Sequence, residues 1–127
     1  MYIMDKVIPV QYVDYFGSRK TLPEGYVEVS IARGTPVWFK GDKMEDIAPS
    51  WELVHRYKDG SLSDDAYTSI YISQLMSRQD ALQSIVNSII NDKKKYVFKC
   101  HCGKGKFCHR FIWKDVLERV GIPVREL

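Results

Sequence analysis

The residues of this chain that can do chemistry are concentrated in one short stretch. All three cysteines and two of the three histidines lie between residues 100 and 109. Glycines and cations are interleaved with them or follow directly: Gly103, Lys104, Gly105, Lys106 and Arg110. Thiols and imidazoles can bind a soft metal or act as nucleophile and base, whereas glycine N–H groups and cationic side chains bind anions. Three kinds of site therefore compete for the same residues.

The first is a zinc site. Its four ligands would be Cys100, Cys102, Cys108 and either His101 or His109. The usual zinc pair is C-x₂₋₄-C, because that turn aims both thiolates at one ion, and C-x-C on an extended strand is a weaker chelate. We therefore expect no metal cofactor and keep zinc as an alternative.

The second is a thiol nucleophile. His101-Cys102 followed by two glycines is similar to the HC-x₅-R loop of cysteine phosphatases, but the position that requires arginine is Cys108, and the arginine comes at 110. The phosphatase loop is therefore not matched. At the start of the last predicted helix, Cys108 would have its pKa lowered by the helix dipole and by Lys106 and Arg110. We expect Cys108 and His109 to be the catalytic pair if there is a reaction.

The third is a non-covalent anion site. Backbone N–H groups of Gly103 to Gly105, the helix N-terminus and the side chains of Lys104, Lys106 and Arg110 would hold the anion, with Cys100 beside them. Residues 93–110 contain seven basic and no acidic side chains, whereas the remaining chain has 12 basic and 16 acidic ones. Such a concentration of positive charge indicates a phosphate-bearing ligand, either a nucleotide or a nucleic acid.

A structural interpretation accompanies all three kinds of site. Cysteine often packs as a small hydrophobic residue, so any one of these cysteines needs no function. Five cysteines and histidines within ten residues, mixed with lysine and glycine, favour a functional site. Tyr12, Asp14 and Tyr15 could line the same edge of the fold, although for both tyrosines we favour core packing.

Patterns along the chain predict the elements that position this stretch. Strands are expected where β-branched and aromatic residues gather, at residues 7–16, 26–31, 96–102 and 124–127. Helices are expected where apolar residues recur at helical spacing, at residues 50–57, 63–75, 79–92 and 108–120. Serines precede the first two helices, and residues 77–80 resemble a capping box for the third. Residues 36–50 have no clear period, and Val37 to Phe39 could form a short strand or an apolar anchor.

This order of elements favours an α/β fold. We expect one domain over residues 1–127, with a mixed or mostly parallel sheet covered by helices and the site at the carboxyl edge of the sheet. No apolar run approaches the ~20 residues that span a membrane, and the N-terminus lacks the pattern of a signal peptide. The odd number of cysteines indicates reduced thiols in a cytoplasm. Oligomeric state does not follow from the sequence.

The C-terminal third resembles the family called domain of unknown function 488 (DUF488), found in bacteria and their phages. That family shows an apolar strand that ends in cysteine, an acidic residue two positions on, a short loop and then Cys-His-Arg at a helix start. Residues 97–100 resemble the strand, and Cys108, His109 and Arg110 match the triplet. Cys102 stands where the acid is common, so the resemblance assigns no carboxylate role here.

Weaker likeness to the phage-type branch extends upstream. It rests on Val29-Ser30-Ile31, Pro36, Ile47-Ala48-Pro49, Tyr57-Lys58-Asp59-Gly60, Tyr67 and Tyr71. The resemblance implies an α/β fold with the triplet at the carboxyl edge of the sheet, and it implies no established activity. The alternative function is a small phage-encoded accessory protein that binds a host protein through Trp38, Phe39 and Trp51, with the Cys-His-Arg site purely structural.

Overall fold

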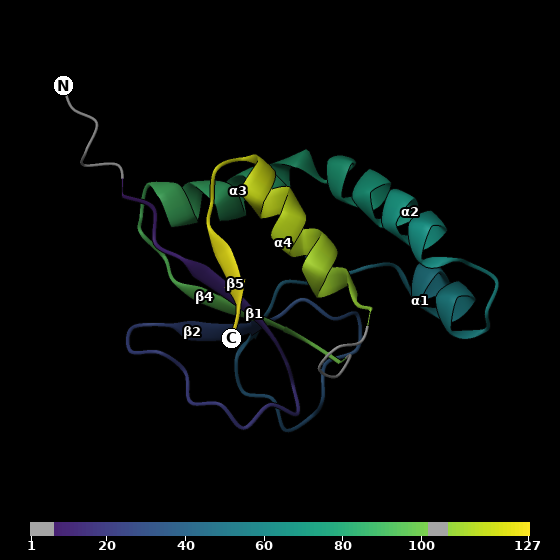
Figure 1. The fold of residues 1–127 in the computed structure, drawn as a ribbon, viewed down its shortest axis with the longest axis horizontal. Coiled ribbons are helices and arrows are strands. Elements are labelled where there is room, and N and C mark those ends of the chain that lie inside the picture. The colour runs from purple at the N-terminus through teal and green to yellow at the C-terminus, as the bar shows by residue number, and fades with distance from the viewer. Residues whose placement is uncertain (1–6, 102–106) are drawn as a thin grey trace.

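The computed structural model describes residues 7–101 and 107–127, which form one five-stranded parallel sheet with helices packed against it (Figure 1). The strands are β1 (Gln11–Tyr15), β2 (Val27–Ser30), β3 (Asp42–Lys43), β4 (Tyr96–Cys100) and β5 (Val124–Glu126). The helices are the short 3₁₀ helix η2 (Glu45–Ile47), α1 (Trp51–Lys58), α2 (Asp64–Met76), α3 (Gln79–Ile90) and α4 (His109–Arg119). The predicted single-domain α/β fold is confirmed, and every strand pair is parallel.

The strand order β3-β2-β4-β1-β5 decides which face each connection covers. Crossovers between parallel strands are right-handed. The connections from β3 to β4 and from β4 to β5 advance in the same direction across the sheet, so α1 to α4 lie on one face. The connections from β1 to β2 and from β2 to β3 advance in the opposite direction and cover the other face with irregular chain. Figure 1 shows this division, with all four helices on one side of the strands.

The helix starts follow local capping chemistry. The Ser50 hydroxyl accepts a hydrogen bond from the Leu53 N–H, and the Ser63 hydroxyl accepts one from the Ala66 N–H, so both predicted serine caps are confirmed. The predicted capping box before α3 is wrong. Arg78 is the N-cap there without a side-chain bond, because the Ser77 hydroxyl donates instead to the Gln74 carbonyl of the preceding helix.

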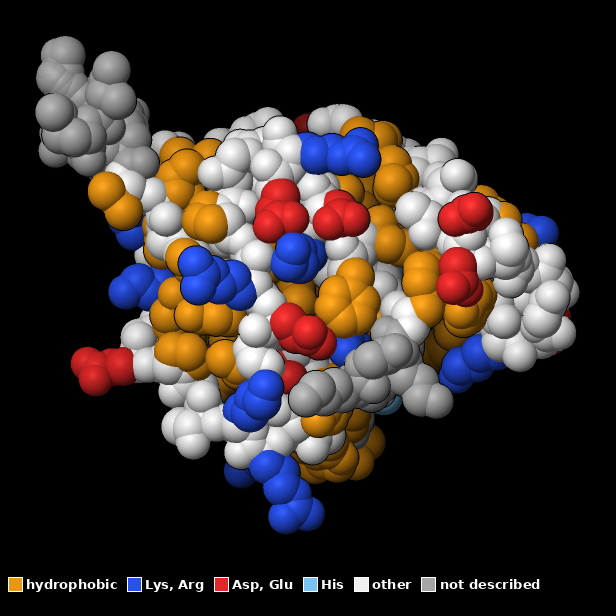
Figure 2. Space-filling model, in the orientation of Figure 1, with side chains coloured by type: hydrophobic (Ala, Val, Ile, Leu, Met, Phe, Trp, Pro, Cys, Tyr) orange, Lys and Arg blue, Asp and Glu red, His pale blue; other side chains and the backbone are white. Residues whose placement is uncertain are grey.

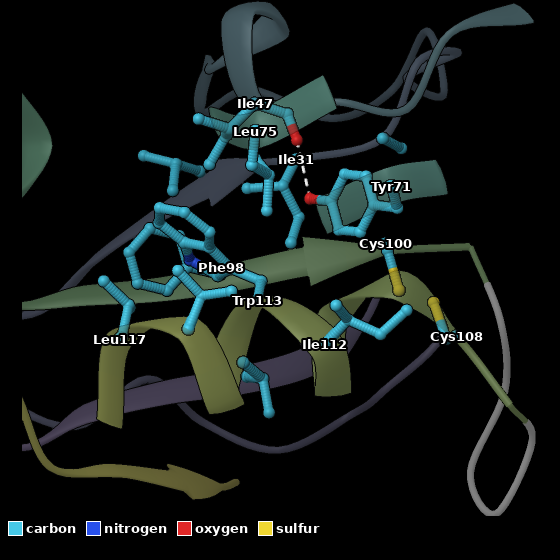
Figure 3. Packing of buried hydrophobic residues seen from close by; sticks show 14 of the residues in the cluster. Ile31, Ile47, Tyr71, Leu75, Phe98, Cys100, Cys108, Ile112, Trp113 and Leu117 are labelled. Carbon is cyan, nitrogen blue, oxygen red and sulfur yellow. Dashed lines mark hydrogen bonds between the residues drawn. The ribbon is translucent and has the colours of Figure 1, made fainter. Parts of the chain in front are cut away.

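The helical face of the sheet carries the core. Phe98 at the centre of β4 packs edge-on against Trp113 of α4, with 5.6 Å between ring centroids, and both are fully buried. Figure 3 shows Leu117 and Ile112 of α4 on the same side of β4. Burial of side chains of this size contributes about 1.5–3 kcal/mol each, so this layer fixes α4 against the end of β4.

The opposite face of the sheet holds a buried charge group. Lys99 Nζ lies 3.1 Å from a Glu28 carboxylate oxygen and 3.9 Å from Asp14 Oδ2. Asp14 is 1 % exposed and Lys99 6 % exposed. Since side chains alternate along a strand, Asp14 and Lys99 point away from Cys100 and the helices.

Residues 36–50 depart from the expectations. Val37 to Phe39 form a turn rather than a strand, with Phe39 buried and Val37 and Trp38 exposed. The strand of this region is β3, whose two residues are both exposed, so it carries no hydrophobic pattern by which it could be predicted. It pairs with β2 as an edge strand.

The outer surface is mixed in character. Figure 2 shows acidic and basic side chains interspersed on the face viewed in Figure 1. Within the described ranges, none of the helices combines the length and the apolar character that crossing a bilayer requires.

Candidate functional site

The end of β4 and the start of α4 bring two thiols and an imidazole together. Cys100 is the last residue of β4, Cys108 is the N-cap of α4, and His109 is its first residue. One ligand atom from each of the three lies within 4.8 Å of the other two, and all three residues are buried. Figure 3 shows both sulfur atoms beside one another beyond the end of β4. The expectation that these residues meet at the strand-to-helix junction agrees with this geometry.

His109 is held in one tautomer by the neighbouring strand. Its Nε2 lies 2.8 Å from the carbonyl oxygen of Ile31, directly after β2. A carbonyl can only accept, so Nε2 carries a proton, and in the neutral imidazole Nδ1 then carries the lone pair. Nδ1 lies 3.7 Å from Cys108 Sγ. The imidazole is therefore oriented to accept the thiol proton of Cys108.

Arg110 follows His109 in α4, is fully buried and contacts Cys100 from outside the lining of the cavity. Its Nη1 donates to Cys100 Sγ at 3.2 Å, and its Nη2 lies 3.9 Å from a Glu126 carboxylate oxygen. The guanidinium also lies over the Phe111 ring at 4.5 Å and the Tyr15 ring at 5.8 Å. Arg110 thus ties the start of α4 to the ends of three strands, β4, β5 and β1.

Two pKa shifts reflect this packing. For Arg110, burial is the largest single influence and acts to lower the pKa, but the hydrogen bond and charge of Cys100, followed by Cys108, raise it above its ordinary value. Burial raises the pKa of Tyr71 well above its ordinary value, with further contributions from Tyr67, Cys108 and Cys100. The Tyr71 hydroxyl donates to the Ile47 carbonyl at 2.6 Å, and its ring meets the His109 ring edge-on.

A cavity of about 260 Å³ opens beside the thiol of Cys108. Most of its lining is aromatic or apolar, from four parts of the chain. The lining residues are Ala32, Arg33, Gly34, Pro49, Trp51, Val54, Tyr57, Lys58, Tyr67, His101, Phe107, Cys108 and His109. Among the described residues of the cluster, Cys108 and His109 belong to this lining, and Cys100 and Arg110 do not.

The aromatic wall is a packed cluster from α1, α2 and the segment before α4. Tyr57 and Tyr67 lie 5.1 Å apart between ring centroids, and Phe107 lies 5.4 Å from Tyr57 and 5.5 Å from Tyr67. Trp51 stands at the start of α1 and is 56 % exposed. Three packed rings and one half-exposed ring therefore line the cavity.

The remaining wall is held by backbone contacts. Arg33 donates from Nε to the Pro49 carbonyl at 2.9 Å and from Nη2 to the carbonyls of Glu45 and Ala48, both at 3.1 Å. His101 contacts the Gly34 carbonyl through Nε2. A methyl group on Gly34 would lie 3.1 Å from the Trp51 ring, so glycine lets the indole approach this wall closely.

The structure separates the sequence-predicted residues into three groups. It brings Cys100, Cys108, His109, Arg110 and Tyr15 together, as described above. It does not bring Tyr12 or Asp14 to them, because Tyr12 packs against Tyr26 and both side chains belong to the opposite face of the sheet. The predictions for Cys102, Gly103, Lys104, Gly105 and Lys106 concern residues outside the described ranges.

The donor set has the composition of a metal site. Cys100, Cys108 and His109 could hold an ion through two sulfurs and Nδ1, and the Nε2–H bond to a carbonyl is typical of metal-binding histidines. The Arg110 guanidinium at 3.2 Å from Cys100 Sγ acts against a cation there, because its positive charge would be added to that of the ion.

The aromatic residues of α1 and α2 are among the lining residues that sequence reasoning did not assign to the site, together with Phe107 and the loop after β2. The sequence suggests Trp51 only as part of an interaction surface, and it points to Tyr57 and Tyr67 only through the family resemblance. The resemblance includes these two tyrosines together with the Cys-His-Arg triplet, and this is the signal by which they could be assigned to the site.

Comparison with known protein families decides the classification. A family model named DUF488-N3a, described as the active DUF488-N3 subclade, matches residues 19–121. The chain belongs to the DUF488 family. The matched range includes β2 to α4 and thus the whole lining of the cavity. No curated protein and no solved structure matches this DUF488 chain.

Proposed function

We propose that this DUF488 protein binds a nucleotide, either as a monomer or within a nucleic acid, with its base in the cavity beside Cys108. The observation that carries the proposal is the aromatic lining of a 260 Å³ cavity next to a cysteine, a histidine and basic residues. Aromatic rings bind bases by stacking, at about 1–3 kcal/mol per base, and any base offers a π-face.

The phosphate would lie at the mouth of the cavity. Lys58 is exposed and belongs to the lining. The glycines and lysines at 103–106, which the sequence predicts to bind an anion, lie outside the described residues. Arg110 has a different role in this proposal from the one its sequence suggests. Because it is fully buried against Cys100 and Glu126, it positions the thiols from behind rather than contacting the phosphate.

We also propose that the site is catalytic. Cys108 would act as nucleophile and His109 as the base that takes its proton, since Nδ1 faces the sulfur and Nε2 is fixed by the Ile31 carbonyl. The description of the matching family model as an active subclade supports this part of the proposal. Ligand binding does not depend on it.

The test is equilibrium binding of nucleoside monophosphates and short oligonucleotides to two matched tryptophan variants. Trp51 lines the cavity and is 56 % exposed, whereas Trp38 is 61 % exposed and does not line it. Both substitutions remove an exposed indole, so their effects on folding should be small and similar. Trp51→Ala should weaken binding by about 5- to 150-fold, the equivalent of ~1–3 kcal/mol, and Trp38→Ala should leave it unchanged.

Equal affinity in wild type and Trp51→Ala would contradict the proposal. Binding of free nucleosides and of inorganic phosphate is measured separately. Nucleoside binding reports on the base site in the cavity, and phosphate binding reports on the anion site at its mouth. For oligonucleotides, the slope of affinity against salt concentration reports the number of phosphates contacted.

A second candidate function has its own observation. Val37 is fully exposed and Trp38 61 % exposed on the turn after β2, and exposed apolar side chains of this size suit a protein partner. We propose this turn as the contact of an accessory protein with a host protein. Loss of partner binding in Trp38→Ala, with nucleotide binding absent from the wild type, is the pattern that would favour this function.

A further inference from the structure

We infer that Cys108 and Cys100 form an oxidation site at which a peroxide entering the cavity converts the two thiols into a disulfide. The inference concerns a reaction of the protein itself and does not require that the cavity bind a nucleotide. The cluster holds two thiols, Cys100 and Cys108, whereas the proposed catalysis needs only Cys108 as nucleophile.

The first support is proximity. Cys100 ends β4 and Cys108 precedes α4, with seven residues between them, and their sulfur atoms lie within 4.8 Å of one another. Figure 3 shows the two side chains turned toward each other from the strand and from the helix start. Cys108 has extended backbone angles of φ −157° and ψ 150° and lies outside the α-helical segment. A small adjustment at this junction can bring the sulfurs to the ~2 Å of a disulfide bond.

The second support is unequal access. Both cysteines are buried, Cys108 at 2 % exposed and Cys100 at 0 %, but Cys108 and His109 belong to the lining of the cavity and Cys100 does not. A small reagent that enters the cavity therefore meets Cys108 first. This order makes Cys108 the thiol that is oxidised and Cys100 the thiol that resolves the product.

The third support is the placement of groups that assist each step. His109 Nδ1 lies 3.7 Å from Cys108 Sγ and can accept its proton. Arg110 Nη1 donates to Cys100 Sγ at 3.2 Å and stabilises negative charge on that sulfur. The two thiols thus have different neighbours, each suited to one step.

The chemistry balances with a peroxide as the oxidant. The Cys108 thiolate attacks one peroxide oxygen, so that an S–O bond forms, the O–O bond breaks, and an alcohol or water leaves with a proton. The Cys100 thiolate then attacks the sulfur of the resulting sulfenic acid, an S–S bond forms, and the S–O bond breaks with loss of water. In total, two thiols and one peroxide give one disulfide, one alcohol and one water.

The experiment treats reduced, purified protein with one equivalent of hydrogen peroxide and maps its disulfides by mass spectrometry without reduction. We expect one linkage, Cys100 to Cys108, which dithiothreitol reverses. Cys102→Ser is the matched control, because it removes the third thiol and should leave this linkage intact. In Cys100→Ser, Cys108 should stop at the sulfenic acid and be captured by dimedone.

Three results would overturn the inference. The first is a linkage that includes Cys102, and the second is a Cys102→Ser protein whose remaining thiols still react fully with iodoacetamide after peroxide treatment. The third is one zinc ion per chain, retained in Cys102→Ser and lost in Cys108→Ser, which would mean that a metal occupies both thiols. Because wild type and Cys102→Ser decide the question, it does not depend on whether Cys100→Ser folds.

Discussion

Replacement of Arg110 by lysine tests whether the fold needs the planar guanidinium group of this side chain or only its positive charge. Arg110 is fully buried, and lysine keeps the positive charge but loses the planar fork. The bond from Nη1 to Cys100 Sγ, made by a charged donor, is worth about 1.5–3 kcal/mol. The stacking of the guanidinium on Phe111 adds roughly 0.5–2 kcal/mol. Glu126 is half-exposed, so its contact contributes about 1 kcal/mol at most.

Together these contributions amount to about 2–6 kcal/mol, and because lysine keeps the charge and part of these contacts, we expect a loss of about 2–4 kcal/mol in the free energy of unfolding. At about 4 °C per kcal/mol for a chain of this length, the melting temperature should fall by roughly 8–16 °C. Urea unfolding followed by circular dichroism measures the change. Lys114→Gln is the control in the same helix, because the Lys114–Glu118 pair is partly exposed and worth about 0.5 kcal/mol. An Arg110→Lys protein no less stable than this control would refute the structural role of Arg110.

Two further predictions concern the core and the pH dependence of stability. Ile89 is fully buried, so Ile89→Ala should lower the free energy of unfolding in urea by about 2–5 kcal/mol. Ile85 is only partly buried, so Ile85→Ala should lower it clearly less. Burial raises the pKa of Tyr71 in the folded state, so above about pH 10 the unfolded chain loses this proton first and stability falls as pH rises. Tyr71→Phe should flatten that fall and lower stability near neutral pH by about 1 kcal/mol, through loss of the bond to the Ile47 carbonyl; an equally steep fall in the variant would contradict the assignment.

The sequence predicts the helices of this fold well because each carries its own signal. Ser50 and Ser63 cap as expected, and the apolar positions of α3 and α4 recur at helical spacing. Prediction from the sequence fails where an element forms only through contact with neighbouring elements. β3 exists only because an edge of β2 is available for pairing, and Ser77 serves the end of α2 rather than the start of α3.

The candidate site divides in the same way. Cys100, Cys108, His109 and Arg110 are adjacent in the chain to a strand end and a helix start, so their meeting follows from local structure. The aromatic wall depends on how α1 and α2 pack beside that junction, which no local pattern determines. The burial of Arg110 could not be predicted either, because its partner Glu126 belongs to β5, which reaches the site only through the parallel pairing of β5 with β1.

The placement of Asp14 shows a third limit. The sequence puts it near the end of β1, and the direction of its side chain depends on the register of β1 with β4. That register pairs Asp14 with Lys99 and turns both away from Cys100, so Asp14 joins a buried ion pair on the far face. A change of one residue in register would have placed it in the site.

The most direct test of nucleotide binding in the cavity is a titration of ¹⁵N-labelled protein with a nucleoside monophosphate, followed by amide chemical shifts. We predict saturable shifts for residues from separate parts of the lining, such as Gly34, Val54 and His109, with little change at Val37 and Trp38. Shifts confined to Val37 and Trp38, or no saturable shift in the lining, would contradict the account.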